Sequence, residues 1–215
     1  MGIESRLIQR IGDVGKKLHT SRSRNDQCQV DTRLYLRKEI YEILNSLCYL
    51  ESVILEKAEK YADQITVGFT HLQHAQPITI GFVFMAYFQM FKRDIERLMD
   101  TVERLNYNPL GACALAGTTM PIDRHLTSEL LHFKAPTENA MDTVSDRDYS
   151  LEFLSDASIS MMHLSRWAEE FACWNSSDFS YIAIDDSFCT GSSIMPQKTN
   201  PDMAELIRGK VGRVY

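Results

Sequence analysis

The strongest indication of fold class in this chain is the segment DQCQVDTRLYLRKEIYEILNSLCYLESVILEKAEKYAD, residues 26–63. It lies inside a window, residues 16–67, that contains neither glycine nor proline. Its apolar side chains recur mostly at intervals of three, four or seven residues, as on one face of an α-helix. They are Val30, Leu34, Ile40, Ile43, Leu44, Leu47, Leu50, Ile54, Ala58 and Tyr61. A helix from Asp26 to Asp63 would be about 55 Å long and needs packing partners along its whole length.

Three further segments predict helices and make the chain all-α. Residues 82–108 and 137–190 contain neither glycine nor proline, and the second has apolar helical periodicity between Leu151 and Phe171. A fourth helix is expected to start at Pro201 and to continue to Tyr215. Strand patterns are nearly absent, with Tyr181–Ile184 as the one short candidate. We therefore expect an elongated bundle of long helices.

The composition excludes several classes of partner. The 215 residues are 44% hydrophobic, enough for one sizeable core or for part of a larger protein's core. A formal net charge of -6 argues against a nucleic-acid partner. The most apolar run, residues 78–91, is shorter than the roughly 20 residues that span a bilayer. Five cysteines without a C-x-x-C pair are typical of a reducing cytoplasm, where we expect the protein to be.

The stretch GSSIMPQKTNPD, residues 191–202, concentrates groups suited to carbanion chemistry. Two serine hydroxyls precede Lys198, and Asn200-Pro201-Asp202 predicts an N-cap followed by proline at the first helical position. A carboxylate held by Lys198 and by a helix N-terminus could take up the charge that builds when a neighbouring C–H is deprotonated. Residues 191–200 are therefore a candidate catalytic loop.

Three motifs together identify a family. GSSIMPQKTNPD resembles the signature of the fumarase/aspartase superfamily, whose members eliminate an amine, amide or hydroxyl to release fumarate. HTSRSRNDQ, residues 19–27, and THLQHAQP, residues 70–77, resemble motifs of the argininosuccinate lyases, which Gln197 also fits. The resemblance covers essentially the whole chain. It implies reversible cleavage of argininosuccinate into arginine and fumarate, without a cofactor or metal.

The resemblance assigns roles in the catalytic loop. Ser192 matches the catalytic base, with Ser193 as the alternative base. A serine alkoxide requires nearby positive charge, which Lys198 supplies. Lys198 and Asn200 would bind the substrate carboxylate on which charge develops.

The second motif supplies further site residues. His71 would donate a proton to the departing guanidino nitrogen or order the site through a hydrogen bond, with Glu205 at the position of its partner carboxylate. Thr70 and Gln73 match substrate-binding positions. A metal site at His71 and His74 is the other interpretation, but no ligand cluster in the sequence completes it. The other histidines are expected to be structural or on the surface: His19, His125, His132 and His163.

The first motif supplies substrate-binding residues Ser23, Arg24 and Asn25, and Arg147 matches another arginine on the substrate side. Arginine offers a planar fork that fits a carboxylate. On physical grounds alone, Asn25-Asp26 reads equally well as a helix cap. The motif also departs from its relatives, because Ser21 replaces the usual glycine and could strain a backbone that prefers a positive φ.

The resemblance also implies an assembly. Superfamily members pack long helices from four subunits into one bundle, and each active site is built from three chains. We expect a homotetramer in which residues 1–215 are a central helical domain, truncated at both ends relative to the family, so that the chain alone has little activity. Two other readings remain open: a non-catalytic oligomerisation protein like the lens crystallins of this family, and a sister lyase that releases fumarate from another adduct.

Overall fold

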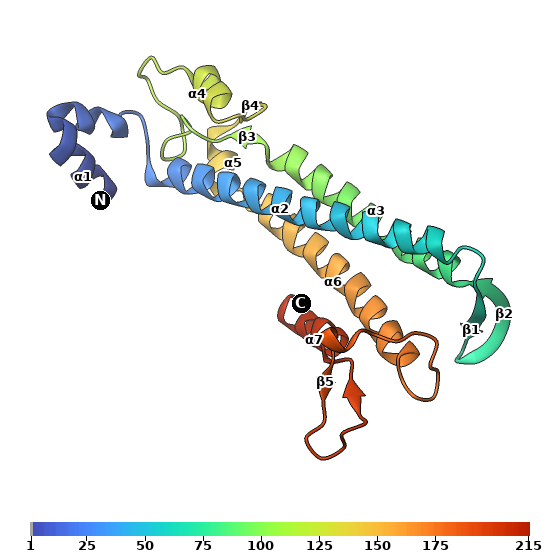
Figure 1. Cartoon of the computed structure of the whole chain (residues 1–215). Coiled ribbons are helices and arrows are strands. Elements are labelled where there is room, and N and C mark those ends of the chain that lie inside the picture. The colour runs from blue at the N-terminus through green and yellow to red at the C-terminus, as the bar shows by residue number, and fades with distance from the viewer. Residues whose placement is uncertain (1) are drawn as a thin grey trace. The chain divides into compact units, whose positions relative to one another are not determined.

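The computed structural model describes residues 2–215, which form two compact units. Unit 1 comprises Met1–Glu42 and Asp100–Tyr149, and unit 2 comprises Ile43–Met99 and Ser150–Tyr215. Three long helices each have residues in both units (Figure 1): α2 (Arg24–Lys60), α3 (Ile80–Leu105) and α6 (Asp148–Trp174). With seven α-helices and only short strands in residues 2–215, the all-α prediction is confirmed. None of these helices is long and apolar enough to cross a membrane.

Helix α2 confirms the prediction made from the apolar periodicity. It runs for 37 residues, from two residues before the predicted start to three before the predicted end. Its buried apolar side chains follow the predicted face, with Val30 and Ile40 in unit 1 and Leu47 and Ile54 in unit 2. The helix is therefore set by its pattern of apolar residues and by the absence of glycine and proline.

Unit 1 contains the first half of α2 and several short elements. They are α1 (Gly2–Ile11), a 3-10 helix (Gly12–His19), α4 (Arg124–Leu130), α5 (Ala140–Ser145) and a parallel pair of two-residue strands, β3 (Tyr107–Asn108) and β4 (Ala135–Pro136). The short helices are capped, since Asp123 accepts the backbone N–H groups of α4 and Asn139 those of α5. Leu105 and Phe133 lie in the core of this unit.

Unit 2 packs aromatic residues of α3 against those of α6. The ring of Trp167 lies 5.7 Å from that of Tyr87 and 5.6 Å from that of Phe91, measured between centroids. Beside them the Nδ1 atom of buried His163 lies 2.7 Å from Asp94 Oδ2. His163 is therefore structural, as predicted.

A β-hairpin lies between α2 and α3, where no strand was predicted. Strand β1 (Ile65–Thr70) pairs antiparallel with β2 (Gln73–Thr79), and the register shifts at Gly68. A side chain at Gly68 would lie 2.9 Å from the carbonyl oxygen of Gln76, so this position requires glycine. The prediction missed the hairpin because Gly68 and Pro77 resemble strand breakers and the turn lacks an Asn-Gly pair.

The C-terminal part corrects two predictions. Tyr181–Ile184 is not a strand, because the N–H groups of Tyr181 and Ile182 donate to the Trp174 carbonyl at the end of α6. The fourth helix is shorter than predicted: α7 (Asp202–Lys210) passes into a 3-10 turn (Val211–Arg213). Glycine is the poorest helix former after proline, and both Gly209 and Gly212 lie where the α-helix ends.

Candidate functional site

The candidate catalytic loop forms a hairpin. Strand β5 (Thr190–Gly191) pairs antiparallel with β6 (Thr199–Asn200). The N–H of Ser192 donates to the carbonyl of Lys198 at 3.2 Å, and the N–H of Met195 donates to Ser192 Oγ at 3.2 Å. These bonds place the half-buried hydroxyl of Ser192 at the base of a closed turn, next to the backbone of Lys198.

The side chain of Asn200 does not cap the following helix, contrary to the sequence prediction. Its Oδ1 atom accepts a hydrogen bond from Lys198 Nζ, whereas Pro201 occupies the N-cap without a side-chain cap and α7 begins at Asp202. An ammonium group makes a stronger hydrogen bond than a backbone N–H, which explains the choice of partner. Lys198 and Asn200 therefore act as one unit at the end of β6.

The second motif lies at the tip of the β1–β2 hairpin. Thr70 pairs with Gln73, and the two turn residues between them, His71 and Leu72, have φ values of 54° and 59°. Such a turn normally takes Asn or Gly, because other side chains are strained at positive φ. The hairpin therefore fixes the backbone of His71 in an unfavourable conformation at its exposed tip.

The side chain of His74 has an aromatic partner within the hairpin. Its ring lies edge-on to Phe69, with 5.4 Å between the centroids. Within residues 2–215 there is no group of three or more His, Cys, Asp and Glu side chains that could hold a metal ion.

The first motif builds the start of α2. Ser23 Oγ accepts the N–H of Asn25 at 3.2 Å, and Asp26 Oδ1 accepts the N–H of Ser23 at 2.9 Å, so the two side chains form a capping box. The helix-cap interpretation is therefore correct for the motif, although Ser23 and Asp26 form the cap. Asn25 instead donates its Nδ2 to the carbonyl of Ala114 at 2.8 Å.

Arg24 lines a cationic pocket of unit 1. The pocket has a volume of about 480 Å³, and its lining includes Arg6, Arg22 and Gln27. Arg22 Nη2 lies 3.3 Å from Glu4 Oε1, while its Nε atom is buried without a hydrogen-bond partner among the described residues. One carboxylate thus faces three guanidinium groups, which leaves the pocket an excess of positive charge suited to an anion.

Arg147 lies at the start of α6. Its Nη1 atom donates to the carbonyl of Asp146 at 2.6 Å, and its side chain is exposed. Asp146 in turn accepts a hydrogen bond from buried Arg33 at 2.5 Å. The exposed guanidinium of Arg147 is therefore bonded to a backbone that the contact between Arg33 and Asp146 holds in place.

Some of the predicted site residues of unit 2 lie together on one hairpin, and others lie elsewhere in the unit. Ser192, Lys198 and Asn200 share one hairpin. Within the described part of unit 2, no hydrogen bond or ion pair joins His71 to Ser192, Lys198 or Glu205. The pairing of His71 with Glu205 is not made within one chain, so it stays a prediction for an assembly of several chains.

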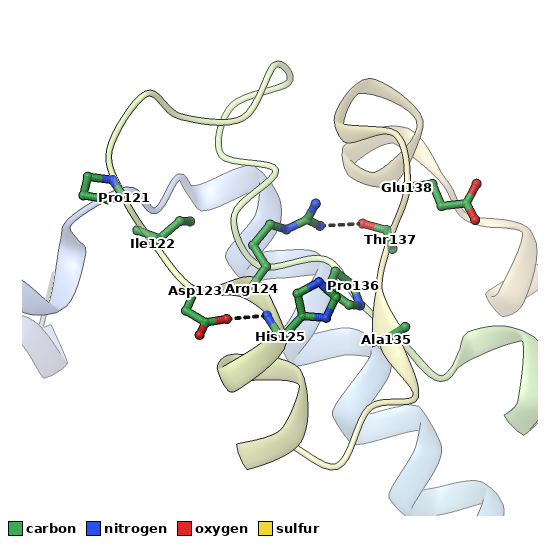
Figure 2. A pocket seen from close by; sticks show the side chains of 9 residues that line it. All are labelled: Pro121, Ile122, Asp123, Arg124, His125, Ala135, Pro136, Thr137 and Glu138. Atoms are coloured by element: carbon green, nitrogen blue, oxygen red, sulfur yellow. Dashed lines mark hydrogen bonds between the residues drawn. The ribbon is translucent and has the colours of Figure 1, made fainter.

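A second hollow of unit 1 contains none of the predicted site residues. This open groove of about 750 Å³ lies between residues 121–125 and 135–138 (Figure 2). Arg124 Nη2 donates to Thr137 Oγ1 at 3.0 Å, and burial lowers the pKa of the guanidinium. At Gly111, whose φ is 90°, a Cβ would lie 2.8 Å from Arg124 Cγ, so this position needs glycine. The groove is shaped by packing around Arg124.

The sequence prediction missed Asp26 as a residue that organises the site. Its side chain is fully buried and accepts three backbone N–H groups. The spacing Ser-x-x-Asp before a long helix was a signal for the capping box, but not for the two distant partners.

Comparisons with known proteins agree with the motifs. The family model described as "Lyase" matches residues 2–215. The chain is 59% identical over 215 residues to an argininosuccinate lyase of Geobacillus sp. (strain WCH70), and covers 47% of that protein. It is 60% identical over 215 residues to the argininosuccinate lyase of Alkaliphilus metalliredigens (strain QYMF), again covering 47% of it. All of this chain matches, while it spans about half the length of these relatives.

Solved structures agree at the level of the fold. EDDS lyase in complex with formate superposes with a TM-score of 0.95 at 33% identity, over 99% of this chain and 43% of that one. A class II fumarase from Schistosoma mansoni superposes with a TM-score of 0.75 over 90% of this chain and 46% of that one, and its 22% identity supports the fold alone. Sequence motifs, family model and fold lead to one conclusion: the chain belongs to the lyase family of the fumarase/aspartase superfamily.

Proposed function

We propose that the protein is a carbon–nitrogen lyase of arginine biosynthesis that cleaves argininosuccinate into arginine and fumarate. The observation that carries the proposal is the hairpin of residues 190–200, which joins the Ser192 hydroxyl, the Lys198 ammonium and the Asn200 amide on one short turn. Its relatives at 58–60% identity bear the name argininosuccinate lyase. In this proposal residues 191–200 are the catalytic loop of the helical domain formed by residues 1–215.

The first step is removal of a proton from the carbon next to a substrate carboxylate. Ser192 Oγ, as an alkoxide, takes that proton, and the N–H that Met195 donates to this oxygen stabilises its negative charge. The electron pair moves towards the carboxylate, where Lys198 provides the compensating charge. Because Asn200 Oδ1 accepts from Lys198, its Nδ2 hydrogens are the donors for the same carboxylate.

The second step breaks the bond between carbon and the guanidino nitrogen. The electron pair on the carbanion forms the double bond of fumarate, and the nitrogen leaves with the bonding pair and takes a proton. His71 is the proposed donor of that proton, and Glu205 is the proposed carboxylate that orients it. The elimination moves protons and electron pairs without a net change of oxidation state, so it calls for no redox or group-carrying cofactor.

The remaining contacts bind the substrate. Arg24 lies in a pocket with an excess of positive charge, which supports a role in holding a carboxylate. Ser23, Asn25 and Arg147 are proposed to complete the substrate contacts of unit 1. In unit 2, Thr70 and Gln73 flank His71 in the turn and are proposed to bind the substrate there.

We also propose a cytoplasmic homotetramer with shared active sites. Shared sites would bring the β1–β2 hairpin of one chain to the catalytic loop of another, which the distribution of candidate residues over separate segments supports. All five cysteines are unpaired, as expected in a reducing compartment.

The test is a chimera in which these 215 residues replace the matching 47% of the Geobacillus relative. Fumarate absorbance after addition of argininosuccinate reports turnover. Ser192→Ala should lower kcat by at least about 100-fold, the scale of removing a catalytic base, without loss of folding.

Ser193→Ala is the matched control, because it removes the neighbouring hydroxyl from the same loop. Its turnover should stay near that of the unsubstituted chimera. A loss confined to Ser193→Ala would identify Ser193 as the base, and a chimera that folds without releasing fumarate would reject the lyase function.

A further inference from the structure

A stripe of buried polar side chains follows one face of α2. Asp26, Gln29 and Arg33 lie three and four residues apart, so they share a face, and their exposed fractions are 0%, 1% and 4%. Buried polar groups are costly unless they are hydrogen-bonded, and each of these three bonds to backbone that is distant in sequence. We call this set the polar stripe.

Asp26 ties the start of α2 to residues 111–114. Its Oδ2 atom accepts the N–H of Gly111 at 3.2 Å and that of Cys113 at 2.8 Å, in addition to the bond from Ser23 to Oδ1. The carbonyl oxygen of Ala114, in the same loop, accepts a hydrogen bond from Asn25 Nδ2. The orientation of the Asn25 amide therefore depends on the loop that Asp26 holds.

Gln29 and Arg33 hold the segment before Arg147 in the same way. Gln29 Nε2 donates to the carbonyls of Val144 at 3.1 Å and Asp146 at 2.9 Å, and Arg33 donates to the Asp146 carboxylate. The hydroxyl of Tyr149 donates to Gln29 Oε1 at 2.8 Å. Residues on both sides of Arg147 are thus fixed to α2.

We propose that the polar stripe positions two substrate-binding segments of unit 1 relative to each other, with Asp26 as the positioning residue for Asn25 and with Gln29 and Arg33 as the positioning residues for Arg147. The proposal rests on the proposed lyase function. A carboxylate suits the place of Asp26 because three N–H donors converge on its two oxygens, and an amide would present a donor to one of them.

Asp26 has a charged neighbour and a thiol neighbour in unit 1. The Arg124 guanidinium interacts favourably with this carboxylate, and Arg124 Nε donates to the carbonyl of Leu110 in the adjoining loop. Burial, and next the charge of Asp26, raise the pKa of the Cys113 thiol. The reactivity of the Cys113 thiol therefore depends both on how well the loop buries it and on the charge of Asp26.

The first experiment compares Asp26→Asn with Arg37→Gln in the active chimera. Arg37 lies one turn beyond the stripe and donates to Asn106 Oδ1 and to the carbonyls of Leu131 and His132, so it supports unit 1 without contacting either segment. Asp26→Asn should raise the KM for argininosuccinate about tenfold, the effect of about 1.4 kcal/mol of lost binding, and change kcat far less. Arg37→Gln should lower thermal stability and leave KM unchanged.

The second experiment measures alkylation of Cys113 by iodoacetamide in the 215-residue chain, with the other four cysteines as internal references. Asp26→Asn should accelerate alkylation of Cys113 several-fold, and Arg37→Gln should not. If Asp26→Asn does not fold, Gln29→Met replaces it in the kinetic test and should raise KM through Arg147.

The outcomes separate the two proposals. An unchanged KM in an active chimera, or unchanged alkylation of Cys113, overturns the positioning role of Asp26. An inactive unsubstituted chimera rejects the lyase function, and the alkylation rate then still decides whether Asp26 holds the loop.

Discussion

Ser21 carries backbone strain within the first motif. Its φ of 52° lies in the left-handed region, which glycine adopts without penalty and other residues do not. The related motif has glycine at this place, and the concern that serine would be strained here is confirmed. The strain persists because the segment is held on two sides: Ser21 Oγ lies 3.2 Å from Thr118 Oγ1, and Cys113 Sγ donates to the Ser21 carbonyl.

Replacing Ser21 should therefore reveal the strain. Ser21→Gly is expected to raise the free energy of unfolding by about 1 kcal/mol, because it removes the Cβ that makes positive φ unfavourable. Ser21→Ala keeps that Cβ and loses only the hydroxyl, so it should not stabilise the protein. Urea unfolding of both variants separates the two effects, and equal stability of the two would contradict backbone strain at this position.

His71 shows that strain and a candidate catalytic role coincide in the β1–β2 hairpin. Both turn residues have positive φ, and the exposed fraction of Leu72 is 86%. Neither side chain gains burial that would offset the strain. The two-residue turn of the hairpin holds both residues at positive φ, and strained residues cluster at functional sites, which agrees with the proposed role of His71.

At the scale of elements, two helical glycines illustrate how packing overrides helix propensity. Gly81, at the start of α3, lies where a Cβ would be 2.5 Å from the carbonyl oxygen of Ala58 and 2.9 Å from Ala62 Cα. Gly209, near the end of α7, would place a Cβ in open space. One glycine permits close approach of the chain, and the other only weakens its helix.

The same substitution should consequently have opposite effects at the two sites. Gly81→Ala is expected to destabilise the protein by about 1–3 kcal/mol through overpacking against backbone. Gly209→Ala should stabilise it by up to about 1 kcal/mol through helix propensity. Chemical denaturation of both variants provides the measurement. Stabilisation by Gly81→Ala would mean that α3 does not approach the end of α2 as closely as described.

At the scale of the whole molecule, the long helices expose large apolar side chains that one chain leaves uncovered. On α2 the exposed fractions are 65% for Tyr35, 51% for Tyr41 and 73% for Tyr49, and Phe82 and Leu151 are exposed on α3 and α6. Large apolar side chains that are exposed on a helix indicate positions where a partner packs. A second copy of the chain is the partner that the shared-bundle proposal predicts.

We expect the chain to associate, with a mass by light scattering of four times the 24.7 kDa of one chain. Tyr49→Glu places a charge at one of these exposed positions on α2 and should weaken association by at least tenfold, since a buried unpaired charge is costly. Leu130→Glu, on the short helix α4, is the control and should leave the mass unchanged. A folded monomer at micromolar concentration would contradict the tetramer.

The long helices and the family were predictable from the amino-acid sequence. Helix α2 follows from apolar spacing and from the absence of glycine and proline, both of which are local properties of the chain. The motifs containing Ser192, His71 and Asn25 could be recognised because each is contiguous. The helix cap before α2 was likewise foreseeable, although Ser23 and Asp26 form it rather than Asn25.

The partners of the buried polar groups could not be predicted, because they depend on how distant segments pack. Asp26 reaches the N–H groups of Gly111 and Cys113, more than 80 residues away, and no local pattern specifies such a distant pair. The bond between Asn200 and Lys198 is different, because it joins residues two positions apart and was missed although it is local. Gly68 and Pro77 have low strand propensity, yet both lie in the β1–β2 hairpin. Strand pairing and the close approach of the backbone at Gly68 outweigh that low propensity, which depends on context more than helix propensity does.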